Sequence, residues 1–158
     1  MPVYEASCLT TLVSASANAP LAAYRASTSQ RSEIIEVGIS YLTAPTTSGG
    51  IGLARSSAIG TGTLTSVSGK PRDPSDSIPA TPGQLITNWG TAAPTVDTAS
   101  IFRRWAFPAS LGNGVIWTYD RIDPMEVAAA TAATSELIFI NLPGTAPGTF
   151  YIYVAWEE

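Results

Sequence analysis

The clearest alternation of hydrophobic and polar residues lies near the end of the chain, at residues 150–157. A period of two predicts a strand with one buried face. The residues of that face are Phe150, Ile152, Val154 and Trp156. Residues 137–142, just before it, are apolar at both parities, which is typical of a strand covered on both sides, inside a sandwich or under a partner. Pro143-Gly144 suits a tight turn, so the two strands are expected to form a hairpin.

A second alternation covers residues 33–42 and predicts another strand. Ile35, Val37, Ile39 and Tyr41 share one parity and are expected to share one face. Residues 1–13 are predicted to be a first strand or an extended N-terminal arm. Weaker patterns predict shorter strands, and no stretch has convincing helical periodicity. These strands are expected at residues 21–26, 51–55, 61–68, 85–89, 100–107, 115–119 and 125–130.

Residues 71–98 differ from the rest because five prolines interrupt them, leaving room only for the short strand at 85–89. A connection of this length in a compact domain is usually functional or covers another surface. Many short strands separated by turns predict one all-β domain over residues 1–158. We expect a jelly-roll-like antiparallel β-sandwich of about eight to ten strands.

The composition is poor in charge. Only 13% of residues are charged, where about 25% is typical. Eight basic and twelve acidic residues give a net charge of −4, without the basic excess of a nucleic-acid-binding protein. A surface with so little charge is suited to being covered by another protein. The N-terminus lacks a basic segment, and no apolar run approaches the ~20 residues of a membrane span, so no membrane segment is expected.

Histidine is absent and Cys8 is the single cysteine. The missing histidine removes the commonest general base and transition-metal ligand, which excludes Ser-His-Asp, Cys-His and zinc-hydrolase chemistry. One cysteine cannot form an intrachain disulfide, and we interpret Cys8 as a small buried hydrophobic residue. We expect no metal or cofactor.

Acidic residues gather in two places. Asp120, Asp123 and Glu126 could offer oxygen ligands to calcium, but their spacing does not match a calcium-binding loop. Asp73 and Asp76 raise the same question in a solvated loop. Turn formation explains the aspartates more simply. A pair of carboxylates could also hydrolyse a glycosidic bond, although some pair always lies close among twelve acids.

The basic residues suggest two further sites. Ser68 and Lys70 could form a nucleophile pair, but a lysine that protects a sheet edge from pairing is the better interpretation. The segment FRRWAF, residues 102–107, mixes arginines with aromatic rings, as single-strand nucleic-acid platforms do. Arg103 and Arg104 should point to opposite faces of a strand, so they cannot form one basic track. We expect one to be exposed and the other to pack against Trp105 or pair with a carboxylate.

Trp89 and Trp105 could line a sugar-binding platform, because aromatic rings stack on sugar faces. As core residues they need no such role. Exposed tryptophans in a groove would favour sugar binding, whereas buried ones would favour a structural role.

Three stretches carry a family resemblance: EIIEVGISYL at residues 33–42, GGIGLARS at 49–56, and SELIFINLPG…GTFYIYVAWEE at 135–158. With the Pro-rich insertion, they resemble the small jelly-roll structural proteins of tailed bacteriophages, particularly head decoration (cement) proteins. The resemblance implies a β-sandwich that trimerises and sits on the outside of a capsid, bridging major capsid subunits. It implies no catalytic residues. A domain of a phage tail, fibre or base plate stays open as an alternative.

We therefore expect a structural protein without enzymatic activity, made in the host cytoplasm and located on the outer capsid surface of the virion. Its expected partners are the major capsid protein and two further copies of itself in a homotrimer, with no nucleic acid and no membrane. The alternatives are a receptor- or carbohydrate-binding module of a phage tail or fibre, and a glycoside-active enzyme. Residues 71–98 are the first expected contact surface and the N-terminal arm is the second. The expected contact residues are Pro71, Pro74, Pro79, Pro82, Trp89, Ile138, Ile140 and Leu142.

Overall fold

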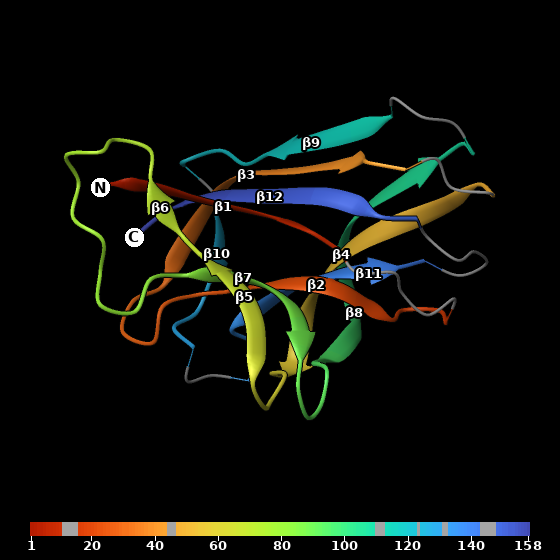
Figure 1. Ribbon diagram of the computed structural model, residues 1–158, viewed down its shortest axis with the longest axis horizontal. Coiled ribbons are helices and arrows are strands. Elements are labelled where there is room, and N and C mark those ends of the chain that lie inside the picture. Colours follow the sequence, from red (N-terminus) through yellow and green to blue (C-terminus); the bar gives the residue numbers. More distant parts are fainter. Residues whose placement is uncertain (11–15, 44–46, 110–112, 123, 131–132, 143–147) are drawn as a thin grey trace.

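The predicted all-β sandwich is confirmed by the computed structural model of the chain (Figure 1). The structure describes residues 1–10, 16–43, 47–109, 113–122, 124–130, 133–142 and 148–158. These residues form twelve strands in two antiparallel sheets and no helix. The strand number exceeds eight to ten, and the strand that the sequence did not predict is the two-residue β6 (Lys70–Pro71). The strand expected at residues 125–130 is the three-residue β10 (Met125–Val127).

The first sheet, sheet A, has the strand order β10-β3-β12-β1-β6, and β9 pairs with β3 as well. Its longer strands are β1 (Val3–Leu9), β3 (Ser32–Tyr41), β9 (Gly114–Thr118) and β12 (Phe150–Glu157). The second sheet, sheet B, has the order β5-β7-β2-β11-β4-β8. Its strands are β2 (Pro20–Arg25), β4 (Gly49–Ala58), β5 (Leu64–Ser68), β7 (Gln84–Trp89), β8 (Thr95–Phe107) and β11 (Glu136–Asn141).

The connectivity is that of a jelly roll. The chain crosses between the sheets so that β1, β12, β3 and β9 are neighbours in sheet A, while β2, β11, β4 and β8 are neighbours in sheet B. Two four-stranded layers built by such crossings are two interleaved Greek keys. The insertion between β4 and β8 adds β5 and β7 to the edge of sheet B and β6 to the edge of sheet A.

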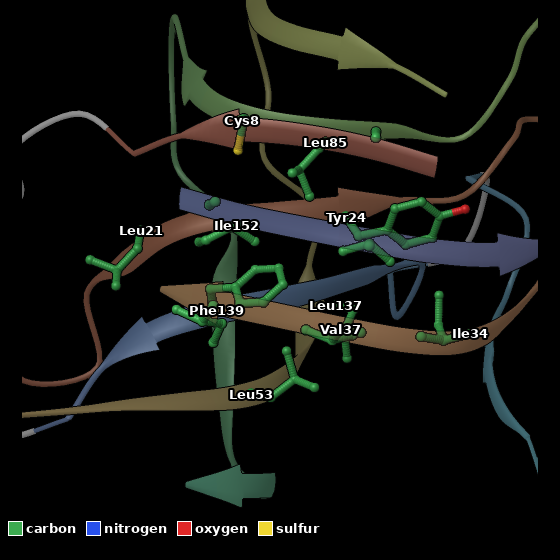
Figure 2. Packing of buried hydrophobic residues seen from close by; sticks show 14 of the residues in the cluster. Cys8, Leu21, Tyr24, Ile34, Val37, Leu53, Leu85, Leu137, Phe139 and Ile152 are labelled. Carbon is green, nitrogen blue, oxygen red and sulfur yellow. The ribbon is translucent and has the colours of Figure 1, made fainter. Parts of the chain in front are cut away.

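The main core fills the space between the two sheets (Figure 2). The predicted buried face of β12 is confirmed, since Phe150, Ile152, Val154 and Trp156 are all 0% exposed. The face of β3 differs from the prediction at one position. Between Glu36 and Ile34 the pairing with β12 shifts by one residue, so Ile34 is buried and Ile35 is half-exposed. A β-bulge adds one unpaired residue and reverses the parity beyond it, which simple alternation does not anticipate.

A second, smaller core covers the other side of sheet B. Leu137 and Phe139 face the main core, whereas Ile138 and Ile140 belong to a cluster with Ile86 and Trp89. Leu64 of β5 and Val96 and Ile101 of β8 pack against this cluster. Figure 1 shows β5, β7 and part of β8 on the side of sheet B away from β3 and β9. Strand β11 is therefore covered on both faces as predicted, but by its own chain.

Two expectations about the connecting segments change. Residues 3–9 form β1 between β12 and β6, with Tyr4, Ala6 and Cys8 in the main core, so this part of the N-terminus is a strand and not an arm. Residues 11–13 lie outside the described part. The Pro-rich region 71–98 contains β7 and the start of β8, and its open part is tied to β1: Arg72 N donates to Val3 O at 2.7 Å, and the Tyr4 hydroxyl donates to Ser77 O at 2.9 Å.

Candidate protein-contact face

Exposed apolar side chains gather on the outer face of sheet A, opposite the main core. The register aligns Leu9 with Tyr151, Tyr151 with Ser40, and Ser40 with Gly114. The next row aligns Ser7, Tyr153, Gly38 and Ile116. The four large side chains that this face exposes are Leu9 (48%), Leu42 (56%), Ile116 (62%) and Tyr151 (39%). We name these four residues the sheet A patch.

Small residues between the large ones keep this face flat. Each row contains one tyrosine of β12, and most of the other positions hold a small residue: Ser7, Gly38, Ser40 and Gly114. The Tyr153 ring lies directly over Gly38, where an added Cβ would be 1.9 Å from Tyr153 Cε1. An aromatic ring laid over a glycine on a neighbouring strand covers its exposed backbone. A flat face with few protruding side chains suits a broad contact with another protein.

Charged groups lie together at one margin of the same face. The Tyr153 hydroxyl donates to Glu36 Oε1 at 2.7 Å, and Arg72 Nη2 lies 2.9 Å from Glu5 Oε2 and 4.0 Å from Glu36 Oε1. Burial and then the Glu36 carboxylate raise the pKa of Tyr153 to about 12. Tyr153 therefore keeps its proton and donates this bond throughout the neutral range. An apolar centre with a polar, paired rim is the usual anatomy of a protein interface.

The residues expected at a contact surface differ in their exposure to solvent. Pro74 is exposed, and Pro71, Pro79, Pro82 and Leu142 are half-buried. Trp89 is 8% exposed, and both Ile138 and Ile140 are 0% exposed. The prediction that Trp89, Ile138 and Ile140 contact a partner is therefore corrected, because all three are buried in the second core, to which β5, β7 and β8 contribute.

The tryptophans do not form an exposed platform. Trp89 is buried in the second core, and its ring packs so closely on Gly60 that a Cβ there would be 2.0 Å from Trp89 Cδ1. Trp105 is half-buried within a group of aromatic rings, with its centroid 5.7 Å from that of Tyr41 and 5.1 Å from that of Phe107. By the criterion of exposure, both tryptophans favour a structural role.

The acidic candidates hold turns and surface ion pairs. Asp73 Oδ1 accepts hydrogen bonds from Ser75 N at 2.9 Å and Ser75 Oγ at 2.8 Å, which lower the pKa of Asp73. Asp120 Oδ1 accepts from Ile122 N at 3.0 Å, and Glu126 lies 2.9 Å from Arg31. Asp123 falls outside the described residues. Among the described residues, no three acidic or cysteine side chains come together in a group that could hold a metal ion.

The basic candidates are also kept apart. Ser68 belongs to sheet B and Lys70 to β6 at the edge of sheet A, so they do not form one site, and Lys70 is placed as an edge charge. Arg103 and Arg104 point to opposite faces as predicted: Arg103 lies over the Tyr119 ring, while Arg104 lines a hollow with Asn18 and Thr98. The sequence predicts that one arginine is exposed and that the other packs against Trp105 or pairs with a carboxylate. Both are exposed, and neither forms an ion pair with a described residue.

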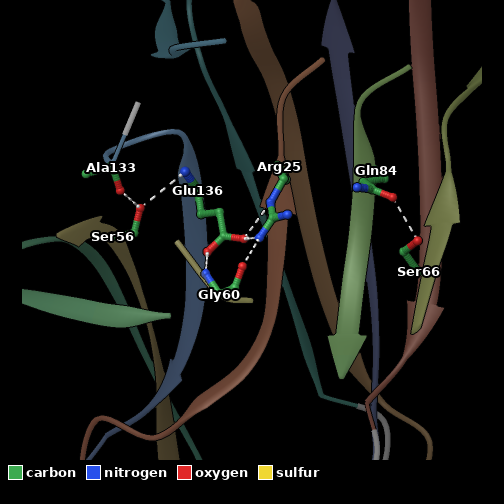
Figure 3. A network of polar contacts seen from close by, with 7 residues as sticks. All are labelled: Arg25, Ser56, Gly60, Ser66, Gln84, Ala133 and Glu136. Carbon is green, nitrogen blue, oxygen red and sulfur yellow. Dashed lines mark hydrogen bonds and ion pairs between the residues drawn. The ribbon is translucent and has the colours of Figure 1, made fainter. Parts of the chain in front are cut away.

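A buried ion pair that the sequence did not reveal fastens β2, β11 and the segment after β4 together (Figure 3). Glu136 is 0% exposed, and its Oε1 accepts from Arg25 Nε at 2.8 Å and from Arg25 Nη2 at 2.5 Å. Glu136 Oε2 accepts from Gly60 N at 3.0 Å, and Arg25 Nη2 also donates to Gly60 O at 2.6 Å. Ser56 links the same region to Ala133 O at 2.6 Å. Both carboxylate oxygens are occupied, so this network is structural.

The sheet A patch was also missed, for an identifiable reason. The alternation in β12 does place Tyr151 and Tyr153 away from the core, so half of the signal is present in the sequence. The other half is the register that brings Leu9 and Ile116 beside them from residues far away in the chain. One sequence does not specify that register.

Comparisons with protein-family models, with curated proteins and with solved structures find no match to this chain. In the described part of the chain, there is no helix of the length and apolarity that crossing a bilayer requires.

Proposed function

We propose that this chain is a structural protein that decorates the outside of a bacteriophage head. The observation that carries the proposal is the sheet A patch, with Leu9, Leu42, Ile116 and Tyr151 open to solvent on a face whose described ion pairs lie at one margin. Exposed apolar groups on one face mark sites of protein contact. The low charge of the whole chain is consistent with a surface that another protein covers.

The phage assignment is supported by the resemblance and by the connectivity. The three stretches that resemble decoration proteins form β3, β4, β11 and β12, which are central strands of the two sheets. The jelly-roll order around them agrees with the fold that the resemblance implies. Beyond these observations, the proposal names the partner, the major capsid protein, and the location on the virion.

Self-association as a homotrimer is part of the same proposal. Because Ile138 and Ile140 are covered by their own chain and the sheet A patch is assigned to the capsid contact, the trimer is supported by the resemblance alone. Three weak contacts on one trimer would add through effective concentration when it docks on a lattice. Light scattering on a sizing column tests this point, and a monomeric mass would contradict it.

The test of the main proposal is cosedimentation with capsids prepared without the protein from the virus that encodes it. Binding should persist at roughly 1 M salt, where the Debye length is about 3 Å, because the contact is mainly apolar. Ile116→Ser and Tyr151→Ser should weaken binding. Val67→Ser is the matched control, since Val67 is 44% exposed but lies on β5 in sheet B. Loss of binding in high salt, or an equal loss in the control, would contradict the proposal.

Carbohydrate or receptor binding by a phage tail or fibre protein is the second candidate, favoured by one observation. The Tyr153 ring lies flat over Gly38 beside the exposed Tyr151, and flat rings can stack on sugars. Binding of the protein to host cells or their polysaccharide, with none to capsids, would establish this alternative. The variant Tyr151→Ser should then reduce cell binding.

A further inference from the structure

An open cleft lies between the two sheets on the side where β8 faces β9 and β10. Arg55 of β4 and Phe102 and Arg103 of β8 line it from sheet B, while Tyr119 and Met125 line it from sheet A. Its volume is about 740 Å³, within the range of small ligand sites. It is separate from the sheet A patch, which lies on the opposite side of sheet A.

A β-bulge in β8 places an aromatic and a basic side chain side by side in the cleft. Leu53 pairs with Arg103, but the next residue, Ala54, pairs with Ile101, so Phe102 is the extra residue. In a regular strand, Phe102 and Arg103 would point to opposite faces. The bulge lets both line the cleft, and bulges commonly redirect side chains in this way beside functional sites.

Both arginines are held over aromatic rings. The Arg55 guanidinium carbon lies 5.3 Å from the centre of the Phe102 ring, and that of Arg103 lies 5.5 Å from the centre of the Tyr119 ring. Stacking on a ring fixes the plane of a guanidinium group and leaves donors on its edge available, and Arg103 Nη1 also donates to Phe102 O at 3.4 Å. The two groups are thus oriented before any ligand arrives.

The positive charge in the cleft is not neutralised by the described residues. Neither Arg55 nor Arg103 forms an ion pair with them, and Glu126, the one described carboxylate that lines the cleft, pairs with Arg31. The Tyr119 hydroxyl oxygen is buried and has no described hydrogen-bond partner. Two guanidinium groups at the same cleft form a donor set for an anion.

We propose that this cleft binds a carboxylate side chain, Asp or Glu, presented by a protein partner. A carboxylate accepts two parallel hydrogen bonds from a guanidinium fork. Apart from Glu126, which pairs with Arg31, the remaining lining is apolar, with Ile122 at 92% exposure and Met125 beside it, and it provides few of the polar groups that sugar hydroxyls need. The inference rests on the proposed function only in taking the partner to be a protein.

The test is a titration with an oligo-glutamate peptide, followed through the side-chain Nε–H signals of the arginines by NMR. Arg55 and Arg103 signals should shift in a saturable way, and Arg55→Ala or Arg103→Ala should each weaken binding about tenfold, the effect of losing one charge-assisted hydrogen bond. Arg104→Ala is the matched control and should change nothing, because Arg104 points to the opposite face. Arg103→Lys keeps the charge but not the fork, and should weaken binding as well.

Three results would overturn the proposal: no saturable shift, an equal loss in the Arg104 variant, or equal binding of an oligo-glutamine peptide. Tighter binding of an oligogalacturonate than of the peptide would also overturn it, in favour of an acidic sugar. Urea unfolding of each variant checks that the fold is intact. Because the titration contains no capsid, its failure leaves the proposed function standing, and failed capsid binding leaves the cleft result standing.

Discussion

The ring of Tyr153 covers Gly38 on the neighbouring strand so closely that a methyl group at Gly38 would be 1.9 Å from its Cε1 atom. The substitution Gly38→Ala should therefore destabilise the protein by about 1–2 kcal/mol, because the ring must move and lose its bond to Glu36. Urea unfolding measures this cost. In a Tyr153→Ala background the cost should largely disappear, and an equal cost in both backgrounds would show that the ring is not its cause.

The buried ion pair should be costly to break. Arg25→Met leaves the fully buried Glu136 without its charged partner, and we expect a loss of about 3–5 kcal/mol. Arg31→Met is the control, since Arg31 is 62% exposed and its pairs with Glu33 and Glu126 should contribute less than about 1 kcal/mol. The loss of stability in each variant is to be measured by denaturant unfolding at one protein concentration. Similar costs for the two variants would contradict a structural role for Glu136.

The burial of β11 by its own chain can be tested by shortening one buried side chain. Ile140→Ala should cost about 2–5 kcal/mol, because it leaves a cavity in the second core. The loss should be the same at all protein concentrations, since the cover belongs to the same chain. A loss that varies with concentration would place Ile140 at a subunit interface instead.

Stability should fall in alkaline solution. Burial raises the pKa of Cys8 from 9.0 to about 12 and also raises the pKa of Tyr24 above 10.0. The folded state holds these protons more tightly than the unfolded state. Their contribution to stability is therefore complete below about pH 9 and is lost as the pH rises toward about 12. Denaturant midpoints between about pH 8 and 11 measure the fall. Cys8→Ala should make it shallower, and a flat profile would contradict the burial of these groups.

Removal of metal ions should have no effect, since the sequence offers no histidine and no complete set of ligands. Thermal unfolding followed by circular dichroism with and without EDTA tests this expectation. A midpoint lowered by more than about 5 °C, which exceeds the ~2–4 °C expected for roughly 1 kcal/mol in a chain of this size, would mean that an ion stabilises the fold.

The sequence supports the prediction of the fold better than that of the sites, for a physical reason. The alternation of β12 depends on neighbouring residues and is visible directly, and so is the two-sided burial of β11. The bulges in β3 and β8 change parity without any clear local signal, and they decide that Ile34 is buried and that Phe102 joins Arg103 in the cleft. The sheet A patch and the Arg25–Glu136 pair depend on contacts between distant segments, 111 residues apart in the latter case.

The pairing of β1 with β12 has a consequence for synthesis. Val3 pairs with Glu157, so the middle of sheet A is made from the first and the last strands of this chain, and Figure 1 shows the two termini near each other. On the ribosome, the edge of β1 that pairs with β12 stays unpaired until residue 157 has been made, although its other edge can already pair with β6. Folding should therefore follow release of this segment, at the slow rate typical of non-local β pairing. A circular permutant that joins the termini by a short linker should fold faster, because the last pairing becomes a local hairpin.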